Sequence, residues 1–331
     1  TRLEQMTVLR RGGPRFDAIT PLVEVDAPGM DDVLRQCLAA DPAERFATGR
    51  ALAFAFESCL HPELHRLLTG PNHGWRLQAR LAPLFAVVTT TILPNAVAAV
   101  FNFLYNRGEI IERVPDALPT FMRIQSIINL IAFPAGASCA WWLAGSVAKA
   151  TSVDQTGPLS PELLVTQRKR CLELGHLAAM VSLTLWVIAA PIYPISLHLM
   201  RGSVPIEVYA TFIASLVLCG LIAMAYPFFG VTMIAVRSFY PPLLRWETVT
   251  RADVSHLERL GRMTWVYLFL AASVPMLSVV CLVLCGQDRR FALVALAAGG
   301  LVGFGIAISA FRWIQRDLEL LIAALSREDR S

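Results

Sequence analysis

The sequence is poor in charged residues, and this shortage decides its class. Only 16% of the 331 residues are charged, whereas 55% are hydrophobic, and the mean hydropathy is +0.54. Because soluble domains carry about 25% charged residues, an ordinary soluble domain is excluded. The net charge of +4 is small, and the lysines and arginines are spread along the chain. The composition therefore predicts an all-α polytopic membrane protein that binds a lipid bilayer and no nucleic acid.

The sequence also lacks a pattern that would hold a metal ion, and Cys281 and Cys285, one helical turn apart near a membrane end, are the only cysteines spaced for a redox pair. Its seven cysteines are scattered and include no Cys-x-x-Cys pair, which is typical of small apolar residues in a reducing compartment or in lipid. His61 and His65 lie four residues apart, as in a zinc protease helix, but Glu63 is displaced by one position from the required order. We therefore expect a surface turn there, and no catalytic, cofactor-binding or metal-binding residue in the chain.

The N-terminal segment reads as short helices outside the membrane. The chain begins at Thr1 without an apolar leader, so we expect it to be a piece of a longer protein. Arg2 to Arg11 is predicted to be a helix that ends at a Gly-Gly-Pro sequence, and Phe16 to Gly29 is predicted to be a loop.

Two further helices are expected on either side of an Asp-Pro turn. Apolar residues between Val33 and Leu38 fall on one helical stripe. Asp41-Pro42 ends this helix, because the residue before a proline is pushed away from helical angles. The next helix follows Thr48, which is a favourable N-cap residue.

This helical pair resembles the last helices of the C-terminal lobe in bacterial serine/threonine protein kinases of the eukaryotic-like type. The similarity covers about the first sixty residues and is carried by Val33 to Phe46 and Ala51 to Phe56. Asp41, Pro42 and Arg45 are its characteristic positions, and the remainder is generic helix. The alternative that we keep open is a polar turn between two unrelated helices.

The resemblance implies a structural role for Arg45. In the family, the matching arginine forms an ion pair with the glutamate of the Ala-Pro-Glu motif, which this chain lacks together with the Gly-rich loop, His-Arg-Asp and Asp-Phe-Gly motifs. ATP and Mg are therefore implied only for a missing upstream kinase lobe, and this chain alone is not catalytic.

Six apolar stretches have the length of about 20 residues that a membrane-spanning helix needs. They are Leu81 to Tyr105, Ile124 to Val147, Leu177 to Leu199, Tyr209 to Val236, Met263 to Leu284 and Phe291 to Trp313. The predicted organisation is kinase-lobe helices at 1–60, a linker at 61–80, the membrane domain at 81–313 and an amphipathic tail at 314–331.

Positive charge predicts the orientation of these spans. Lysine and arginine are more frequent in the second and fourth connections and in the C-terminal tail than in the other three connections. Because cytoplasmic segments carry this excess, we expect a multi-pass protein of the bacterial inner (plasma) membrane with both termini in the cytoplasm.

The interiors of the spans contain few polar or ionisable side chains. None has an Asp, Glu, Lys or Arg near its middle, which argues against an ion-coupled pump. Asn95, Asn102 and Asn129 are the deepest polar residues, and hydrogen bonding between helices is a sufficient explanation for them. Gly299 and Gly303 form a GxxxG pair, for which we expect close helix packing within the chain or in a homodimer.

These observations lead to one expected function and two alternatives. We expect a region that anchors a serine/threonine kinase in the membrane, with sensing and dimerisation as additional roles. The first alternative is a small-molecule transporter or channel with kinase-like N-terminal helices, which the proline-containing spans favour. The second is a purely structural anchor.

Overall fold

Every regular element that the structure describes is a helix. The structure is a computed structural model, and it describes residues 2–11, 29–113, 118–153, 159–202, 206–245, 248–284 and 290–326. The predicted all-α class is therefore confirmed. Most of the loop predicted at Phe16 to Gly29 and the last residues of the predicted tail lie outside the described residues.

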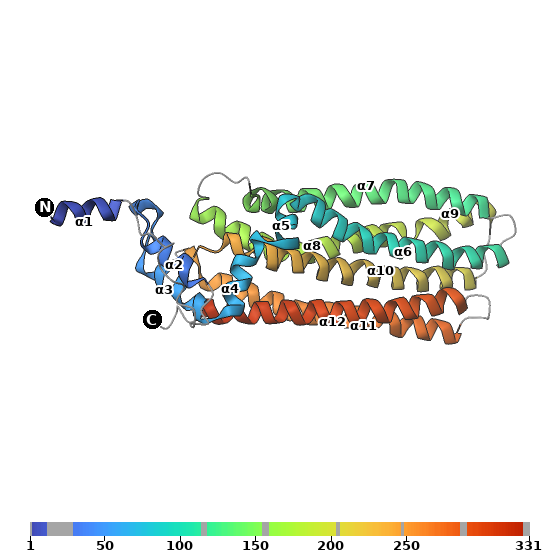
Figure 1. The fold of residues 1–331 in the computed structure, drawn as a ribbon. Coiled ribbons are helices and arrows are strands. Elements are labelled where there is room, and N and C mark those ends of the chain that lie inside the picture. Colours follow the sequence, from blue (N-terminus) through green and yellow to red (C-terminus); the bar gives the residue numbers. More distant parts are fainter. Residues whose placement is uncertain are drawn as a thin grey trace.

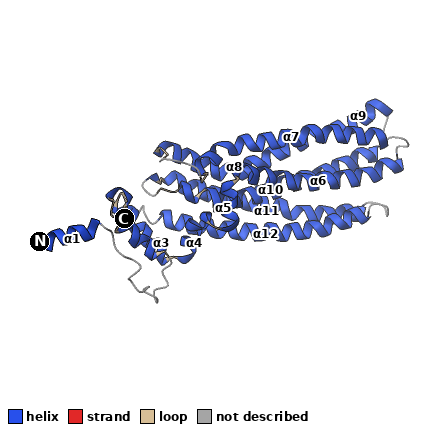
Figure 2. Ribbon diagram, turned by 45° about the horizontal axis from the view of Figure 1, so that its top comes forward, coloured by secondary structure: helices blue, strands red, loops and turns tan. Residues whose placement is uncertain are grey.

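Six helical segments are long and apolar enough to cross a membrane, as the sequence predicted. They form an elongated bundle, with neighbouring helices roughly parallel or antiparallel (Figure 1, Figure 2). The helices are α6 (Pro83–Arg113), α7 (Leu118–Thr151), α8 (Pro161–Ala189) with α9 (Ile192–Arg201), α10 (Ile206–Ile234), α11 (Arg251–Leu284) and α12 (Arg290–Ser326). The chain is thus a multi-pass membrane protein.

Helix α10 is the central element of the bundle. In its most apolar window 61% of the residues are buried, against 17–33% in the other spans. It packs against α6 and α8 on one side and against the α11–α12 hairpin on the other (Figure 1). Because α10 is shielded from lipid by protein on both sides, its residues hold the two halves of the bundle together.

The third span differs in its bounds from the predicted stretch Leu177 to Leu199. Helix α8 begins at Pro161, because Ser160 Oγ accepts a hydrogen bond from Leu163 N (3.4 Å) and proline suits the first helical position. It ends at Ala189, before Pro191, and α9 then continues the span. A helix that is broken inside the membrane leaves backbone groups that neighbouring residues must satisfy.

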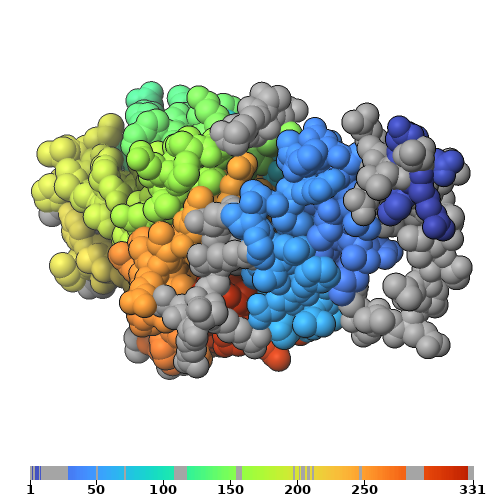
Figure 3. Space-filling view, turned by 90° about the vertical axis from the view of Figure 1, so that its left-hand side faces the viewer, coloured from blue at the N-terminus to red at the C-terminus, as the bar shows by residue number. Residues whose placement is uncertain are grey.

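The N-terminal helices lie at one end of the bundle, where the C-terminal end of the chain also lies (Figure 1). In the end-on view they cover part of that face beside the start of α11 (Figure 3). They are α1 (Arg2–Arg11), α2 (Met30–Cys37), η2 (Pro42–Glu44), α3 (Gly49–Leu60), α4 (Pro62–Thr69), η3 (Gly70–Asn72) and α5 (Gly74–Leu81).

The stretch predicted to be a linker at 61–80 is packed onto the membrane domain. Leu64 of α4, Leu67 of α4 and Ala79 of α5 are buried in the main core. Arg80 Nε donates a hydrogen bond to Thr151 O at the end of α7 (3.1 Å). Pro62 and Gly74 are the first residues of α4 and α5, and Gly70 follows the end of α4. The short helices that they delimit are amphipathic and bury their apolar sides.

The described part of the predicted tail, residues 314–326, continues the last span within the single helix α12. Leu318, Leu321 and Leu325 are buried in the main core, while Arg316 on the outer side forms an ion pair with Glu63 of α4. The apolar side of this segment is therefore covered by the chain itself. This ion pair links α12, the last helix of the described chain, to α4.

A buried ion pair closes the same end of the bundle. Arg168 of α8 is fully buried, and its Nε and Nη2 donate to the Asp253 carboxylate at 2.9 and 3.0 Å. The remaining N–H groups donate to Leu243 O, Thr248 Oγ1 and Thr248 O. Because each of its five N–H donors has an acceptor, the buried guanidinium is fully compensated.

Close packing of α8 against α10 depends on a glycine. A Cβ atom at Gly175 would lie 2.0 Å from Thr232 Oγ1 and 2.9 Å from the backbone oxygen of Phe228. No side chain larger than hydrogen fits without separating the two helices.

Within the chain, close packing is found at one member of the Gly299–Gly303 pair. A Cβ at Gly303 would lie 2.5 Å from Tyr226 Oη, whereas a Cβ at Gly299 would meet nothing within 4 Å. Gly303 thus packs against α10 within the chain, and Gly299 faces away from it.

We expect Gly175→Ala to lower the free energy of unfolding by about 1–3 kcal/mol, since overpacking forces helices apart. Gly145→Ala is the matched control, because a Cβ there meets nothing within 4 Å and alanine favours helix. Denaturant unfolding in detergent measures both. Equal stabilities for the two variants would contradict the packing described for α8 and α10.

A candidate functional site inside the membrane region

The three residues singled out by the kinase resemblance lie on an exposed turn. Asp41 Oδ1 accepts a hydrogen bond from Ala43 N (2.8 Å), and Pro42 begins the short helix η2. Arg45 Nε donates to Ala39 O (2.8 Å). These side chains stabilise the turn between α2 and α3, and they line neither of the two pockets described below.

A small hydrophobic core supports this turn. Val33 of α2 and Cys59 of α3 are buried, and Phe46, Leu52 and Phe56 pack around them. Burial raises the pKa of the Cys59 thiol above its ordinary value, so the thiol stays protonated. The helical pair therefore has a small core of its own, while Phe54 of α3 is buried in the main core with residues of the membrane domain.

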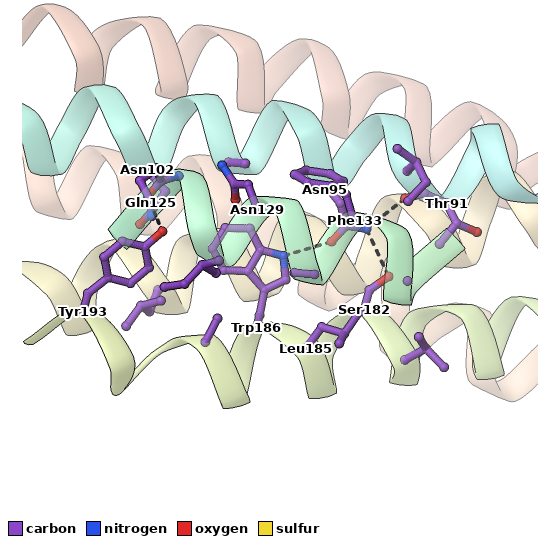
Figure 4. A pocket seen from close by; sticks show the side chains of 18 residues that line it. Thr91, Asn95, Asn102, Gln125, Asn129, Phe133, Ser182, Leu185, Trp186 and Tyr193 are labelled. Atoms are coloured by element: carbon purple, nitrogen blue, oxygen red, sulfur yellow. Dashed lines mark hydrogen bonds between the residues drawn. The ribbon is translucent and has the colours of Figure 1, made fainter. Parts of the chain in front are cut away.

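One cavity lies inside the membrane region, between α6, α7, α8 and α9. It has a volume of about 60 Å³, which is room for a few water molecules or a small polar group. Figure 4 shows polar side chains from these helices that converge on it. The lining includes Thr91, Asn95, Asn102, Gln125, Asn129, Phe133, Ser182, Trp186 and Tyr193.

Asn95, near the middle of the span Pro83–Arg107, ties α6 to α8 at one side of the cavity. Its Nδ2 donates to Ser182 Oγ (3.0 Å) and to Thr91 O (2.8 Å). Its Oδ1 accepts from Trp186 Nε1 at 2.9 Å (Figure 4). The amide is therefore satisfied by protein groups, and it orients the indole of Trp186 along the wall of the cavity.

A second polar contact links the broken third span to α7. Tyr193, the second residue of α9, donates its hydroxyl hydrogen to Gln125 Oε1 on α7 (Figure 4). Trp186 lies on the other side of the break, at the end of α8. Two of the four helices around the cavity thus meet at Pro191, and transporters commonly place ligand sites at such broken helices.

A third group of polar residues includes Asn102, which lines the cavity. Asn106 Nδ2 donates to Asn102 Oδ1 (2.9 Å) and to Ser215 Oγ on α10 (3.0 Å). These three residues are at most 2% exposed. They join α6 to the central helix, so this side of the cavity is anchored to the core of the bundle.

Asn129 differs from the other asparagines. It lines the cavity from α7, between the two hydrogen-bonded groups (Figure 4). Within the residues that the structure describes, its amide makes no hydrogen bond. The expectation that contact between helices explains all three deep asparagines thus holds for Asn95 alone, since Asn102 is bonded along its own helix.

The chemistry available in the cavity is binding rather than catalysis. Its lining contains amides, hydroxyls, an indole and apolar groups, and no Asp, Glu, Lys, Arg, His or Cys. It therefore offers no pair of a nucleophile and a base. Neutral donors and acceptors beside aromatic rings suit an uncharged, polar small molecule.

The part of the chain that the structure describes also contains no group of three or more His, Cys, Asp or Glu residues that could hold a metal ion. His65 packs close to Gly29 instead, since a Cβ at that glycine would lie 1.9 Å from His65 Cε1.

Comparison with known proteins adds no evidence on function. No family model, curated protein or solved structure matches the chain. The function is therefore argued from the residues and their geometry.

Sequence reasoning found the asparagines of the cavity but missed Gln125, Ser182, Trp186 and Tyr193. Each of these residue types also occurs in ordinary membrane-spanning helices, so the residue type alone does not indicate a cavity. The nearest signal was Pro191 together with Pro194, which marks the helix break beside Tyr193.

We expect Asn95→Ala to destabilise the protein by about 1 kcal/mol, because two hydrogen bonds between α6 and α8 are lost. Asn129→Ala is the control, since the same truncation removes no hydrogen bond among the described residues. Unfolding in a denaturing detergent measures the difference. An equal loss in both variants would contradict the assigned network.

Proposed function

We propose that this chain is the membrane-anchoring and sensory C-terminal region of a bacterial serine/threonine protein kinase. The observation that carries the proposal is the state of Arg45. Its Nε is bonded to the turn, while its two outer nitrogens have no partner among the described residues and the side chain is exposed. This geometry supports an arginine that is positioned to meet a carboxylate outside the chain.

The packing of the N-terminal helices provides a route by which the membrane domain would act on the kinase lobe. The helical pair continues into α4 and α5, which pack against α12 and against the π-helix η4 (Ala235–Phe239) at the end of α10. Arg237 of η4 is paired in turn with Asp317 of α12 (2.5 Å). A change in the bundle would therefore be transmitted to the kinase lobe through short, packed connections.

The cavity supplies a sensory element for this proposal. Occupancy by a small polar molecule would favour one arrangement of α9 relative to α7, because Tyr193 and Gln125 lie on those two helices. A ligand shifts such an equilibrium only by its differential affinity for the two arrangements. In a homodimer, this shift would alter the spacing of two kinase lobes.

The proposed location is the inner membrane of a bacterium, with both termini in the cytoplasm. The excess of lysine and arginine on one side supports this orientation. The two ends of the described chain lie at the same end of the bundle (Figure 1). A kinase lobe on that side would have access to ATP and Mg.

The coding sequence upstream of Thr1 is expected to encode a Gly-rich loop, His-Arg-Asp, Asp-Phe-Gly and Ala-Pro-Glu. In the full-length protein, Arg45→Ala should destabilise the kinase lobe by about 3 kcal/mol, because one partner of a buried ion pair is removed. This corresponds to roughly 6–12 °C in Tm for a domain of about 150–250 residues. Calorimetry measures the change in Tm, and an autophosphorylation assay measures the accompanying change in kinase activity.

Arg66→Ala is the control for that experiment, since Arg66 is also exposed but lies on α4, outside the motif. An upstream sequence without these motifs would refute the kinase proposal, as would an Arg45→Ala protein that behaves like the control.

The second candidate is a transporter of small neutral solutes, which the cavity and the helix break at Pro191 favour. Purified protein in proteoliposomes should then pass such solutes, and Asn129→Leu should reduce the flux at least tenfold by filling the cavity. Cys139→Leu, on the exposed side of α7, should leave it unchanged. Absence of flux in the unmodified protein would exclude this function.

A further inference from the structure

A second pocket lies between α8 and α11, away from the cavity described above. Its volume is about 190 Å³. Both helices begin at the end of the bundle that carries the N-terminal segment (Figure 1). The polar part of its lining is Lys169, Glu173, His176, His256 and Arg259.

The polar residues follow helical spacing on each wall. Lys169, Glu173 and His176 are spaced by four and three residues, so they share one face of α8. His256 and Arg259 share one face of α11 for the same reason. Because the two helices start at the same end, their polar stripes run side by side along the groove.

The two cations of the pocket are available for a ligand. Lys169 and Arg259 are exposed, and neither forms an ion pair or a hydrogen bond within the described residues. His176 is held in place by a contact between its Nδ1 and Tyr267 Oη (2.9 Å). Glu173 is the single acidic residue in the lining, so cationic and titratable basic groups outnumber the acid.

The floor of the pocket is apolar. It is formed by Leu172 and Leu177 of α8 and by Leu260 and Met263 of α11. Leu177 and Met263 are also the residues at which the apolar stretches of the two spans begin. Trp265, which is 53% exposed on α11, lies one half-turn further along. Tryptophan is typical of the membrane–water interface, so the pocket lies at headgroup depth.

We propose that this pocket binds an anionic phospholipid, with the phosphate between Lys169 and Arg259 and the first part of an acyl chain against the apolar floor. Guanidinium and ammonium groups make strong, charge-assisted hydrogen bonds to phosphate oxygens. Basic pockets between transmembrane helices bind anionic headgroups in this way. The proposal is independent of the kinase role, because it uses only the membrane domain.

Substitution of Glu173 tests the proposal in the opposite direction, because it is expected to increase the affinity for the lipid. A carboxylate in the pocket repels a phosphate, so Glu173→Gln should bind the lipid more tightly. A variant that merely disturbs the fold would weaken binding. An increase in affinity is therefore specific to an anion site.

The experiment uses the full chain in a neutral detergent, with titration of phosphatidylglycerol followed by native mass spectrometry. We expect the double variant Lys169→Gln/Arg259→Gln to bind about 25-fold more weakly, roughly fivefold for each cation. Glu173→Gln should bind about fivefold more tightly. Phosphatidylcholine, which has the phosphate but no net charge, should bind weakly to every variant.

The control is Lys149→Gln/Arg262→Gln, which removes the same charge from exposed positions outside the pocket lining. An equal loss of affinity in this control would overturn the proposal, because general attraction would then explain the binding. Displacement of phosphatidylglycerol by an equal concentration of inorganic phosphate would also overturn it, since the apolar floor would then contribute nothing. Unchanged affinity in the Lys169→Gln/Arg259→Gln variant is the third contrary result.

Discussion

The buried guanidinium of Arg168 is the interaction on which the near end of the bundle depends. It joins α8 to the start of α11 and to the backbone between α10 and α11, which are 75 to 85 residues away in sequence. A buried charge is tolerated only where all its donors are satisfied, so this network holds the three segments together. Since Arg168 points inward, the next residue, Lys169, is turned toward the groove between α8 and α11.

The number of spans and their order were predictable because bilayer thickness fixes the length of an apolar helix. The helix ends were less predictable, since they depend on local caps and on tertiary contacts. Ser160 and Pro161 start α8 well before the apolar stretch, and Arg168 in this extension is stabilised only by partners distant in sequence. The segment at 61–80 shows the same effect: its turn residues are visible in the sequence, whereas the core that buries Leu64 and Leu67 is not.

The cavity was predictable only in part, and the asparagines show why. Asn95 and Asn129 are similar in the sequence, as asparagines within apolar spans. Asn95 is satisfied by Ser182 and Trp186, which lie 87 and 91 residues away, whereas Asn129 is left facing the cavity. Residue type indicates that a hydrogen bond is needed, but only the packing of α6, α7 and α8 decides which side chain remains available.

Under the proposed sensory role, the connections at the far end of the bundle limit how a stimulus would reach the protein. Helix α6 ends at Arg113 and α7 begins at Leu118, α9 ends at Arg201 and α10 begins at Ile206, and α11 ends at Leu284 before α12 begins at Arg290. These connections are only four or five residues long, so they offer few residues to a water-soluble protein. If the far end faces the outside of the cell, as the charge distribution predicts, signals from there would have to dissolve in the lipid and enter between the helices.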